Sequence, residues 1–303
     1  MTIRFDGRVA IVTGAGGGLG RQHALALGKR GAKVVVNDFG GARDGTGGSA
    51  GPAEQVADEI RAAGGEAIAA VCSVTDEAGV AEMVQATMDK WGRVDILVNN
   101  AGVLRDKTFA KMTVEDFRFV LDVHLMGAVI CSKAVWEIMR AQNYGRIAMT
   151  TSSSGLYGNF GQANYGAAKM GLVGLMQTLA IEGAKYDIRV NSLAPTAATR
   201  MTEDLGGGLD LDALRPDLVT PGLLHLVSEA APTRAILCAG AGGFEAAHVT
   251  LTQGIYADGA HAAEQVAADW AEVQDSDGQI TPDSGAAQGI LEMTKAAKAK
   301  QGA

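Results

Sequence analysis

The chain has 303 residues, 47% of them hydrophobic, and a formal net charge of −8 at pH 7. Because the balance is acidic and no lysine- or arginine-rich block occurs, we expect neither nucleic acid nor an anionic membrane as a partner. No apolar run approaches the roughly 18 residues of a membrane-spanning helix, and the N-terminus lacks the apolar region of a secretory signal, so a soluble cytoplasmic protein is predicted.

The stretch RVAIVTGAGGGLG, residues 8–20, predicts a buried strand, a tight turn and the start of a helix. Its strand, 9–12, is apolar without alternation, and glycines follow at Gly14, Gly18 and Gly20. A glycine-rich turn before a helix lets backbone N–H groups approach a pyrophosphate closely. The spacing G-x-x-x-G-x-G is not the commonest dinucleotide pattern, so an ordinary strand-to-helix loop is the alternative.

Asp38 ends the second predicted strand, residues 33–36, near the position where the acidic residue of dinucleotide-binding folds meets the adenosine ribose. A carboxylate there accepts hydrogen bonds from the ribose hydroxyls and repels a 2′-phosphate. The sequence therefore predicts NAD rather than NADP as cofactor. The alternatives are an aspartate that only ends a strand, and a preference reversed by Arg43 in the next loop.

Strands and helices then alternate, which predicts one doubly wound α/β domain over residues 1–260 and a helical extension over 261–303. The glycine-rich connection 40–51 is predicted to be a flexible loop, with a flap over the adenosine as the alternative. The mixed segment 196–230 is predicted to be the substrate loop. Further strands are expected at 66–71, 94–98, 147–150, 189–193 and 248–255, and helices at 52–63, 76–91, 113–140, 164–184, 262–274 and 284–298.

Tyr165 and Lys169 are four residues apart, so on a helix they share one face, and Ser152 follows the strand that leads into that helix. A phenol with a pKa near 10 is a poor base, but a neighbouring ammonium favours the phenolate. Tyr165 could then exchange the proton of a secondary alcohol while Ser152 holds its oxygen. Alone, such a pair usually means a packed ring beside a solvated charge, and the hypothesis depends on its combination with the glycine turn.

In these motifs the sequence resembles the classical short-chain dehydrogenases/reductases: TGAGGGLG (13–20), NNAG (99–102), Ser152 and YGAAK (165–169), in order, within residues 8 to about 260. The resemblance implies a Rossmann sheet of seven mostly parallel strands with helices on both faces. It also implies catalysis by Ser152, Tyr165 and Lys169. The cofactor-binding positions that it implies are Gly14, Gly18, Leu19, Gly20, Asp38, Ser73, Val74, Asn100, Ala101, Gly102, Tyr165, Lys169, Pro195 and Thr199.

Within that family the sequence is most similar to the (3R)-hydroxyacyl-CoA dehydrogenase domain of peroxisomal multifunctional enzyme type 2, through residues 34–41, 145–153, 155–169, 179–183 and 199–202. This implies an NAD-dependent enzyme that interconverts a (3R)-hydroxyacyl-CoA and its 3-ketoacyl-CoA. A 17β-hydroxysteroid or other bulky alcohol is the alternative substrate. A non-catalytic NAD-sensing module is the alternative of another class, but a sensor need not keep a Ser/Tyr/Lys set.

The sequence departs from the family pattern at three positions. His124 occupies the place of an asparagine that usually completes the proton relay; it is predicted to carry a proton or hold a water, or else to be satisfied inside its helix. Ser73 replaces an aspartate that often contacts adenine, which puts that contact in doubt. Pro195-Thr196 replaces Pro-Gly, which leaves Thr199 as the expected partner of the nicotinamide carboxamide.

The segment 167–181 is apolar or small nearly all round, although a helix that covers one face of a sheet should have a polar outer stripe. We therefore expect a homodimer or homotetramer. No metal site is predicted, because the histidines show no ligand spacing and the three cysteines lie far apart among apolar neighbours. Four cations could meet CoA phosphates or simply be solvated: Arg105, Lys107, Lys111 and Arg200.

Overall fold

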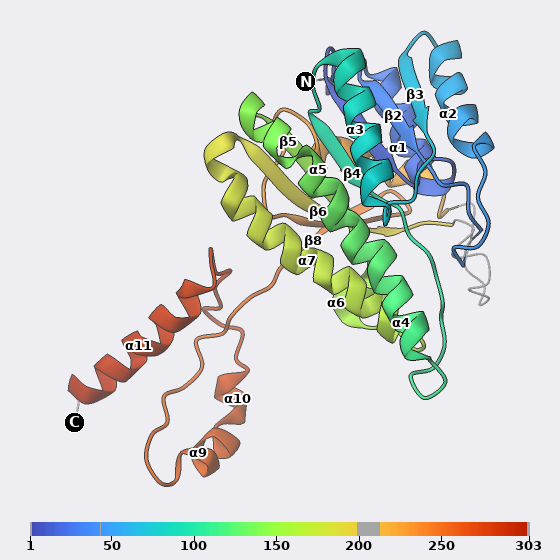
Figure 1. Ribbon diagram of the computed structural model, residues 1–303. Helices are drawn as coiled ribbons and strands as arrows, with labels where there is room; N and C mark the ends of the chain where they lie inside the picture. Colours follow the sequence, from blue (N-terminus) through green and yellow to red (C-terminus); the bar gives the residue numbers. More distant parts are fainter. Residues whose placement is uncertain (1, 43, 199–212, 302–303) are drawn as a thin grey trace. The chain divides into compact units, whose positions relative to one another are not determined.

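The computed structural model describes residues 2–42, 44–198 and 213–301 as two compact units, 1–246 and 247–303 (Figure 1). The first unit contains the sheet and all of the predicted site residues that are described. The sequence places the start of the extension near residue 261, somewhat later than this division.

The first unit is built on one sheet of eight strands in the order β3-β2-β1-β4-β5-β6-β7-β8. The pairs from β3 through β7 are parallel. The chain moves outward from β1 to β3 and then returns to β4 beside β1, so the carboxyl ends of β1 and β4 open a crevice at the reversal point. The strands are Val9–Thr13, Lys33–Asn37, Glu66–Ala70, Ile96–Asn99, Gly145–Thr150, Ile188–Thr196, Ile236–Gly240 and Gly243–Ala247.

Helices cover both faces of the sheet, which confirms the doubly wound class (Figure 1). One layer contains α1 (Gly18–Lys29), α2 (Gly51–Ala62) and α8 (Thr220–Leu226), and the other contains α3 (Glu77–Trp91), α4 (Val114–Leu121), α5 (Gly127–Gln142) and α7 (Ala163–Gly183). Short helices are α6 (Ser153–Tyr157), η2 (Ala184–Tyr186) and η3 (Pro216–Leu218), and the second unit has α9 (Ala262–Ala268), α10 (Trp270–Val273) and α11 (Ala286–Gln301).

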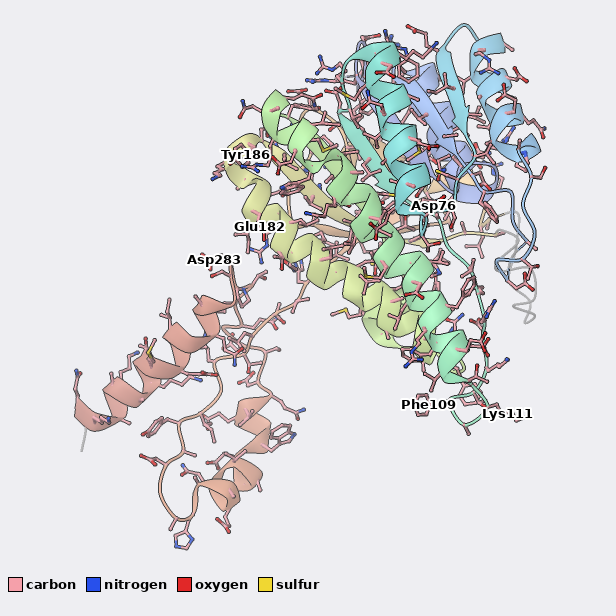
Figure 2. All side chains as sticks on the ribbon, viewed as in Figure 1. Asp76, Phe109, Lys111, Glu182, Tyr186 and Asp283 are labelled. Carbon is pink, nitrogen blue, oxygen red and sulfur yellow. The ribbon has the colours of Figure 1, made fainter. Side chains whose placement is uncertain are left out.

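The helix predicted at 113–140 contains an irregularity that the sequence did not indicate. Between α4 and α5 the backbone forms a π-helical turn, η1 (Asp122–Met126), and such turns are frequent at functional sites. By length and composition the continuous helix Val114–Gln142 could cross a membrane, but here its apolar side packs within the first unit, with Val120, Val135 and Met139 buried. The loop before it has Phe109 and Lys111 at its tip (Figure 2).

The prediction of a strand at 248–255 is wrong. The sheet has eight strands rather than the seven expected. That segment contributes one isolated antiparallel bridge, Leu251 to Ile280, in the second unit. The seventh strand is instead the short ILCAG, β7, which pairs with β6. It returns as β8 through Ala241 and Gly242, whose φ values of 49° and 81° are those of a tight hairpin turn. The segment 248–255 belongs to the second unit and not to the unit that is built on the sheet.

Candidate active site

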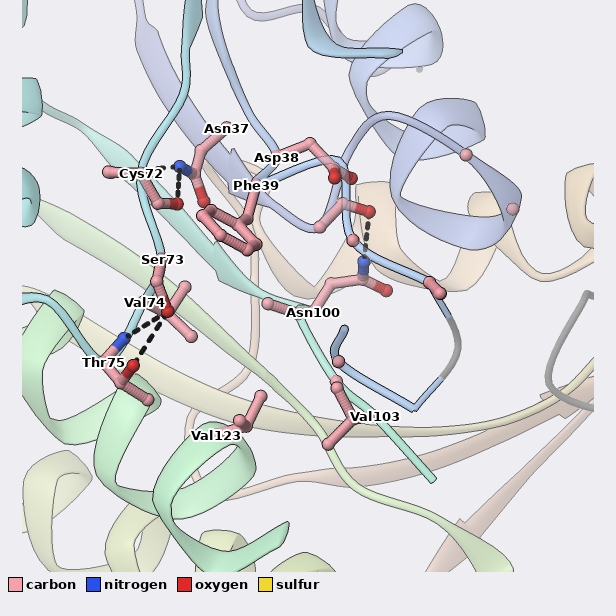
Figure 3. Close-up of a pocket in the computed structure, with 18 of the residues that line it drawn as sticks. Asn37, Asp38, Phe39, Cys72, Ser73, Val74, Thr75, Asn100, Val103 and Val123 are labelled. Atoms are coloured by element: carbon pink, nitrogen blue, oxygen red, sulfur yellow. Dashed lines mark hydrogen bonds between the residues drawn. The ribbon is translucent and has the colours of Figure 1, made fainter. Parts of the chain in front are cut away.

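The glycine turn lines the crevice at the ends of β1 and β4 (Figure 3). Gly14 has φ +62°, and a Cβ there would lie 2.7 Å from Ala101 Cα. A Cβ on Gly20 would lie 2.2 Å from the Gly14 oxygen. Gly17 caps α1 without a side-chain hydrogen bond, and the first turn holds no acidic residue. The first N–H groups of α1 are therefore available to an anion, as a pyrophosphate requires.

The NNAG motif is tied to this turn by a compact set of hydrogen bonds. Asn100 Nδ2 donates to the backbone oxygens of Thr13, at 2.9 Å, and Gly14, at 3.1 Å. Thr13 Oγ1 accepts from the N–H groups of Asn100, at 3.0 Å, and Ala101, at 3.1 Å. These bonds fix the two walls of the crevice relative to each other. The NNAG motif therefore has a structural role in holding the glycine turn in place.

The Asp38 carboxylate lies on the same cavity, at the end of β2. One of its oxygens accepts from Gly16 N at 2.7 Å and the other from Gly40 N at 2.7 Å. Each carboxylate oxygen can accept a further bond, so the group is held in place and can still meet ribose hydroxyls. Arg43, the cation that could reverse this preference, lies outside the described residues.

Most of the predicted cofactor positions line this one cavity: Gly14, Gly18, Leu19, Asp38, Ser73, Val74, Asn100, Ala101 and Gly102. Gly20 lies beneath Gly14. Pro195 is not among the lining residues and pairs with Ala239 in the sheet. Thr199 lies outside the described residues. Lining residues that the sequence did not indicate include Phe39, Cys72, Thr75, Val103, Phe119 and Val123.

Described residues of the glycine-rich connection 40–51 line part of the cavity. Ala42 N donates to Thr46 O at 2.7 Å, and Ser49 N donates to Phe39 O at 3.0 Å. A Cβ on Gly45, which has φ +86°, would lie 2.6 Å from the Phe119 ring. Gly41, Ala42 and Gly45 line the cavity, so the geometry supports the alternative interpretation of this segment as a flap.

Ser152, Tyr165 and Lys169 meet where β5 ends and α7 begins. Ser152 caps α6, and its Oγ accepts from Ser154 N at 3.1 Å. The Lys169 ammonium is buried, lies 5.4 Å from the centre of the Tyr165 ring and donates to Thr150 O at 2.5 Å. The ring of His124 meets that of Tyr165 edge to face, with centres 5.2 Å apart.

Burial controls the acidity of both helix residues. It raises the pKa of Tyr165 to about 12, although a hydrogen bond with Ser152 partly opposes this, and the Asp106 charge raises it further. Burial also lowers the pKa of Lys169 to about 7. The expectation that Lys169 depresses the pKa of the phenol is therefore wrong for this arrangement. The loss of hydration opposes both charged forms, and neither pKa shift has a contribution from the other group.

His124 lies in the π-helical turn, with 3% of its surface exposed. Its Nε2 is 2.8 Å from Val103 O and 3.1 Å from Val103 N. One ring nitrogen cannot both donate and accept, so Nε2 either accepts from Val103 N or donates to Val103 O, according to the tautomer of the ring. Burial, with a smaller contribution from Lys169, lowers the pKa of His124 well below its usual value, so the ring is neutral.

A small cavity of about 10 Å³ adjoins these groups, lined by Asn99, His124 and Lys169 among others. Within the described part of the chain, His124 Nδ1 and Asn99 Oδ1 have no hydrogen-bond partner. The space is about that of one water molecule, and the polar lining gives a water its partners. A Cβ on Gly102 would lie 2.2 Å from His124 Cε1, so the motif glycine leaves room for the imidazole.

A dinucleotide-type crevice beside a Ser/Tyr/Lys group defines the class as a nucleotide-dependent dehydrogenase. The family profile described as short chain dehydrogenase matches residues 8–208. A short-chain type dehydrogenase/reductase of Mycobacterium tuberculosis is 49% identical over 272 residues, 89% of this chain and 95% of that protein. The chain therefore belongs to the short-chain dehydrogenase/reductase family and is an oxidoreductase acting on CH–OH groups.

Two further proteins place the chain within the family. Peroxisomal multifunctional enzyme type 2 of Drosophila melanogaster is 53% identical over 227 residues, 75% of this chain and 38% of that protein. Its full-length structure matches with a TM-score of 0.79 and 38% identity, covering 97% of this chain and 51% of that one. A 7α-hydroxysteroid dehydrogenase complexed with NADH matches with a TM-score of 0.71 and 31% identity, covering 79% of this chain and 95% of that one. The closer resemblance inferred from the sequence is confirmed.

We expect Gly20→Ala to weaken NADH and NADPH binding at least about tenfold, because its Cβ would displace the Gly14 backbone. Quenching of tryptophan fluorescence measures the affinity, and circular dichroism checks the fold. Gly289→Ala in α11 is the matched control, since a Cβ on Gly289 meets nothing within 4 Å. An unchanged affinity of a folded Gly20→Ala protein would contradict the role of this turn.

Lys169→Met should stabilise the folded protein at pH 6.5 by the order of a few kcal/mol. Folding lowers the pKa of Lys169 to about 7, so the unfolded chain binds this proton more tightly. The burial of charged Lys169 therefore lowers the free energy of unfolding by its full amount below pH 7. This loss becomes smaller as the pH rises and disappears above the ordinary lysine pKa. Urea unfolding at pH 6.5 and pH 10 measures the difference, which should be smaller at pH 10. Lys133→Met, at an exposed position of α5, is the control; a destabilised Lys169→Met at pH 6.5 would refute the burial argument.

Proposed function

We propose that this chain is an NAD-dependent dehydrogenase that interconverts a (3R)-hydroxyacyl-CoA and its 3-ketoacyl-CoA. The observation that carries the proposal is the meeting of Ser152, Tyr165 and Lys169 beside a crevice that also holds Asp38. The similarity to multifunctional enzyme type 2 supports the thioester substrate. Because the chain spans only 38% of that enzyme, the proposal concerns the dehydrogenase step alone.

The glycine turn, the free N–H groups of α1 and the Asp38 carboxylate fit a dinucleotide. NAD, when bound, supplies the acceptor for the hydride that leaves the carbinol carbon. Asp38 favours NAD over NADP, because a 2′-phosphate near its carboxylate would place like charges together. Lys169, in this proposal, also holds the nicotinamide ribose.

The side chains of this protein handle the proton. In oxidation Tyr165 passes its own phenolic proton toward Lys169 and takes the hydroxyl proton of the substrate, and in reduction the two transfers run in reverse, while Ser152 donates a hydrogen bond to the same oxygen. Lys169, with a pKa of about 7, exchanges a proton at neutral pH more readily than an ordinary lysine. A water in the small cavity would connect Lys169 to the Nδ1 of the neutral His124, an atom that has no hydrogen-bond partner among the described residues. His124 thus takes the place of the relay asparagine.

The rim of the site offers fewer free cations for CoA phosphates than the sequence suggested. Arg105 and Lys107 both pair with Asp116, at 3.3 and 2.7 Å. Lys111 lies on the exposed loop tip beside Phe109 (Figure 2), and Arg200 lies outside the described residues. A bulky alcohol that lacks phosphates therefore stays a second candidate, supported by the similarity to a hydroxysteroid dehydrogenase.

We expect NADH formation from a (3R)-hydroxyacyl-CoA and none from its (3S) counterpart, with NADP at least about tenfold less effective than NAD. The measurement is the initial rate at 340 nm, with a 17β-hydroxysteroid alongside. Tyr165→Phe should abolish turnover while NADH still binds, because the ring stays and only the proton carrier is lost. Turnover of the steroid alone would contradict the thioester as substrate. No turnover of any of the three substrates, with NADH binding intact, would favour the NAD-sensing module.

We also propose a homodimer or homotetramer assembled through α7. Its outward positions Ala167, Met170, Gly174, Thr178 and Ile181 are exposed and nearly free of charge, with Met170 41% and Ile181 48% exposed. Sedimentation at micromolar concentration should show a dimer or tetramer. Gly174→Arg should shift it toward monomer without unfolding it, because the space above Gly174 is open; a monomeric wild type would contradict the proposal.

A further inference from the structure

A chain of three hydrogen bonds runs behind Ser152. Ser154 N donates to Ser152 Oγ at 3.1 Å, and Ser154 Oγ donates to Gln162 Oε1 at 2.8 Å. Gln162 Nε2 then donates to Asp106 Oδ2 at 2.6 Å. The chain connects three segments: the start of α6, the residue that caps α7 and the stretch after β4.

We infer that Asp106, Gln162 and Ser154 form a positioning relay that orients the hydroxyl of Ser152 for the reaction. The inference rests on the proposed dehydrogenase function and adds three residues to it. None of the three needs to touch the reacting atoms. Asp106 holds Gln162, Gln162 holds the hydroxyl of Ser154, and Ser154 acts on Ser152 through its backbone N–H.

The direction of every bond in the relay follows from the donors and acceptors present. An ionised Asp106 can only accept, so the Gln162 amide must turn its NH₂ toward it. The amide oxygen then faces Ser154, whose hydroxyl must donate. The N–H of Ser154 occupies one acceptor site of Ser152 Oγ, which directs the Ser152 proton away from α6. Because Asp106 is charged, its hydrogen bond with Gln162 is stronger than one between two neutral groups.

Two independent bonds hold the same segments together. Lys107 N donates to Gly161 O at 3.0 Å, and Asn164 Nδ2 donates to Arg105 O at 3.1 Å. The residues on either side of Asp106 are thus fixed to the residues on either side of Gln162. Because Gln162 immediately precedes the first turn of α7, the relay joins the Ser152 segment to the helix that carries Tyr165. The effect of the Asp106 charge on the Tyr165 pKa agrees with this proximity.

Gln162→Met and Ser154→Ala should each lower kcat about 10-fold to 100-fold on the (3R)-hydroxyacyl-CoA, the range expected for a lost hydrogen bond of this kind. The KM for NAD and the affinity for NADH should stay within about twofold. The double variant should be no slower than the slower single variant, since both changes break one chain. Asn159→Ala is the matched control, because Asn159 also donates to Gln162 Oε1, at 3.1 Å, but lies outside the relay.

Multiplicative losses in the double variant, an unchanged kcat, or a rise in substrate KM alone would overturn the relay; the last result would make Gln162 a substrate ligand. Hydrogen exchange of the peptide over 152–158 gives a readout that needs no substrate. Exchange there should accelerate in Gln162→Met and Ser154→Ala but not in Asn159→Ala, and equal exchange in all of them would refute the relay. If the wild type turns over no thioester but the variants differ in exchange as expected, the proposed substrate is rejected and the relay is kept.

Discussion

The site depends on how closely the backbones of the glycine turn and the NNAG segment approach each other at the ends of β1 and β4. Only residues without a Cβ allow it, since a Cβ on Gly14 would lie 2.7 Å from Ala101. The Thr13 hydroxyl and the Asn100 amide close the contact with bonds of 2.9 to 3.1 Å. This approach leaves the start of α1 uncapped and facing the crevice. The anion site is thus a consequence of backbone packing rather than of charged side chains.

A second constraint is the burial of ionisable groups at the other end of the site. Burial shifts Lys169 and Tyr165 in opposite directions, toward a neutral amine and a neutral phenol. In this state the two groups are closer to a proton-conducting pair than to an ion pair. Burying ionisable groups in this way lowers the free energy of unfolding, a cost that is common where a buried group has a function. The neutral His124 beside them adds no charge to this part of the site, and its Nδ1 has no hydrogen-bond partner among the described residues.

The sequence predicted the parts of this fold that are set by local pattern. Apolar runs such as 9–12 marked buried strands, and the glycine spacing and the Tyr165/Lys169 pair marked the crevice. The errors have a common physical cause. A strand was predicted at 248–255, but the strand that pairs with β6 is the short ILCAG of β7, and the sequence pattern alone does not report which segment pairs. Phe119 and Val123 line the cofactor cavity only because α4 and the π-helical turn pack beside it, and no local pattern reports that.

The stretch from Asn99 to Lys107 connects the two ends of the site. Asn100 fastens the glycine turn, Gly102 leaves room for the His124 ring, and Val103 holds that ring through Nε2. A few residues later, Asp106 accepts from Gln162. A displacement of this stretch would therefore change the cofactor crevice and the surroundings of Ser152 together. Hydrogen bonds fix both its start, through Thr13 and Asn100, and its end, through Lys107 N and Gly161 O, so this one short segment couples the cofactor crevice to the surroundings of Ser152.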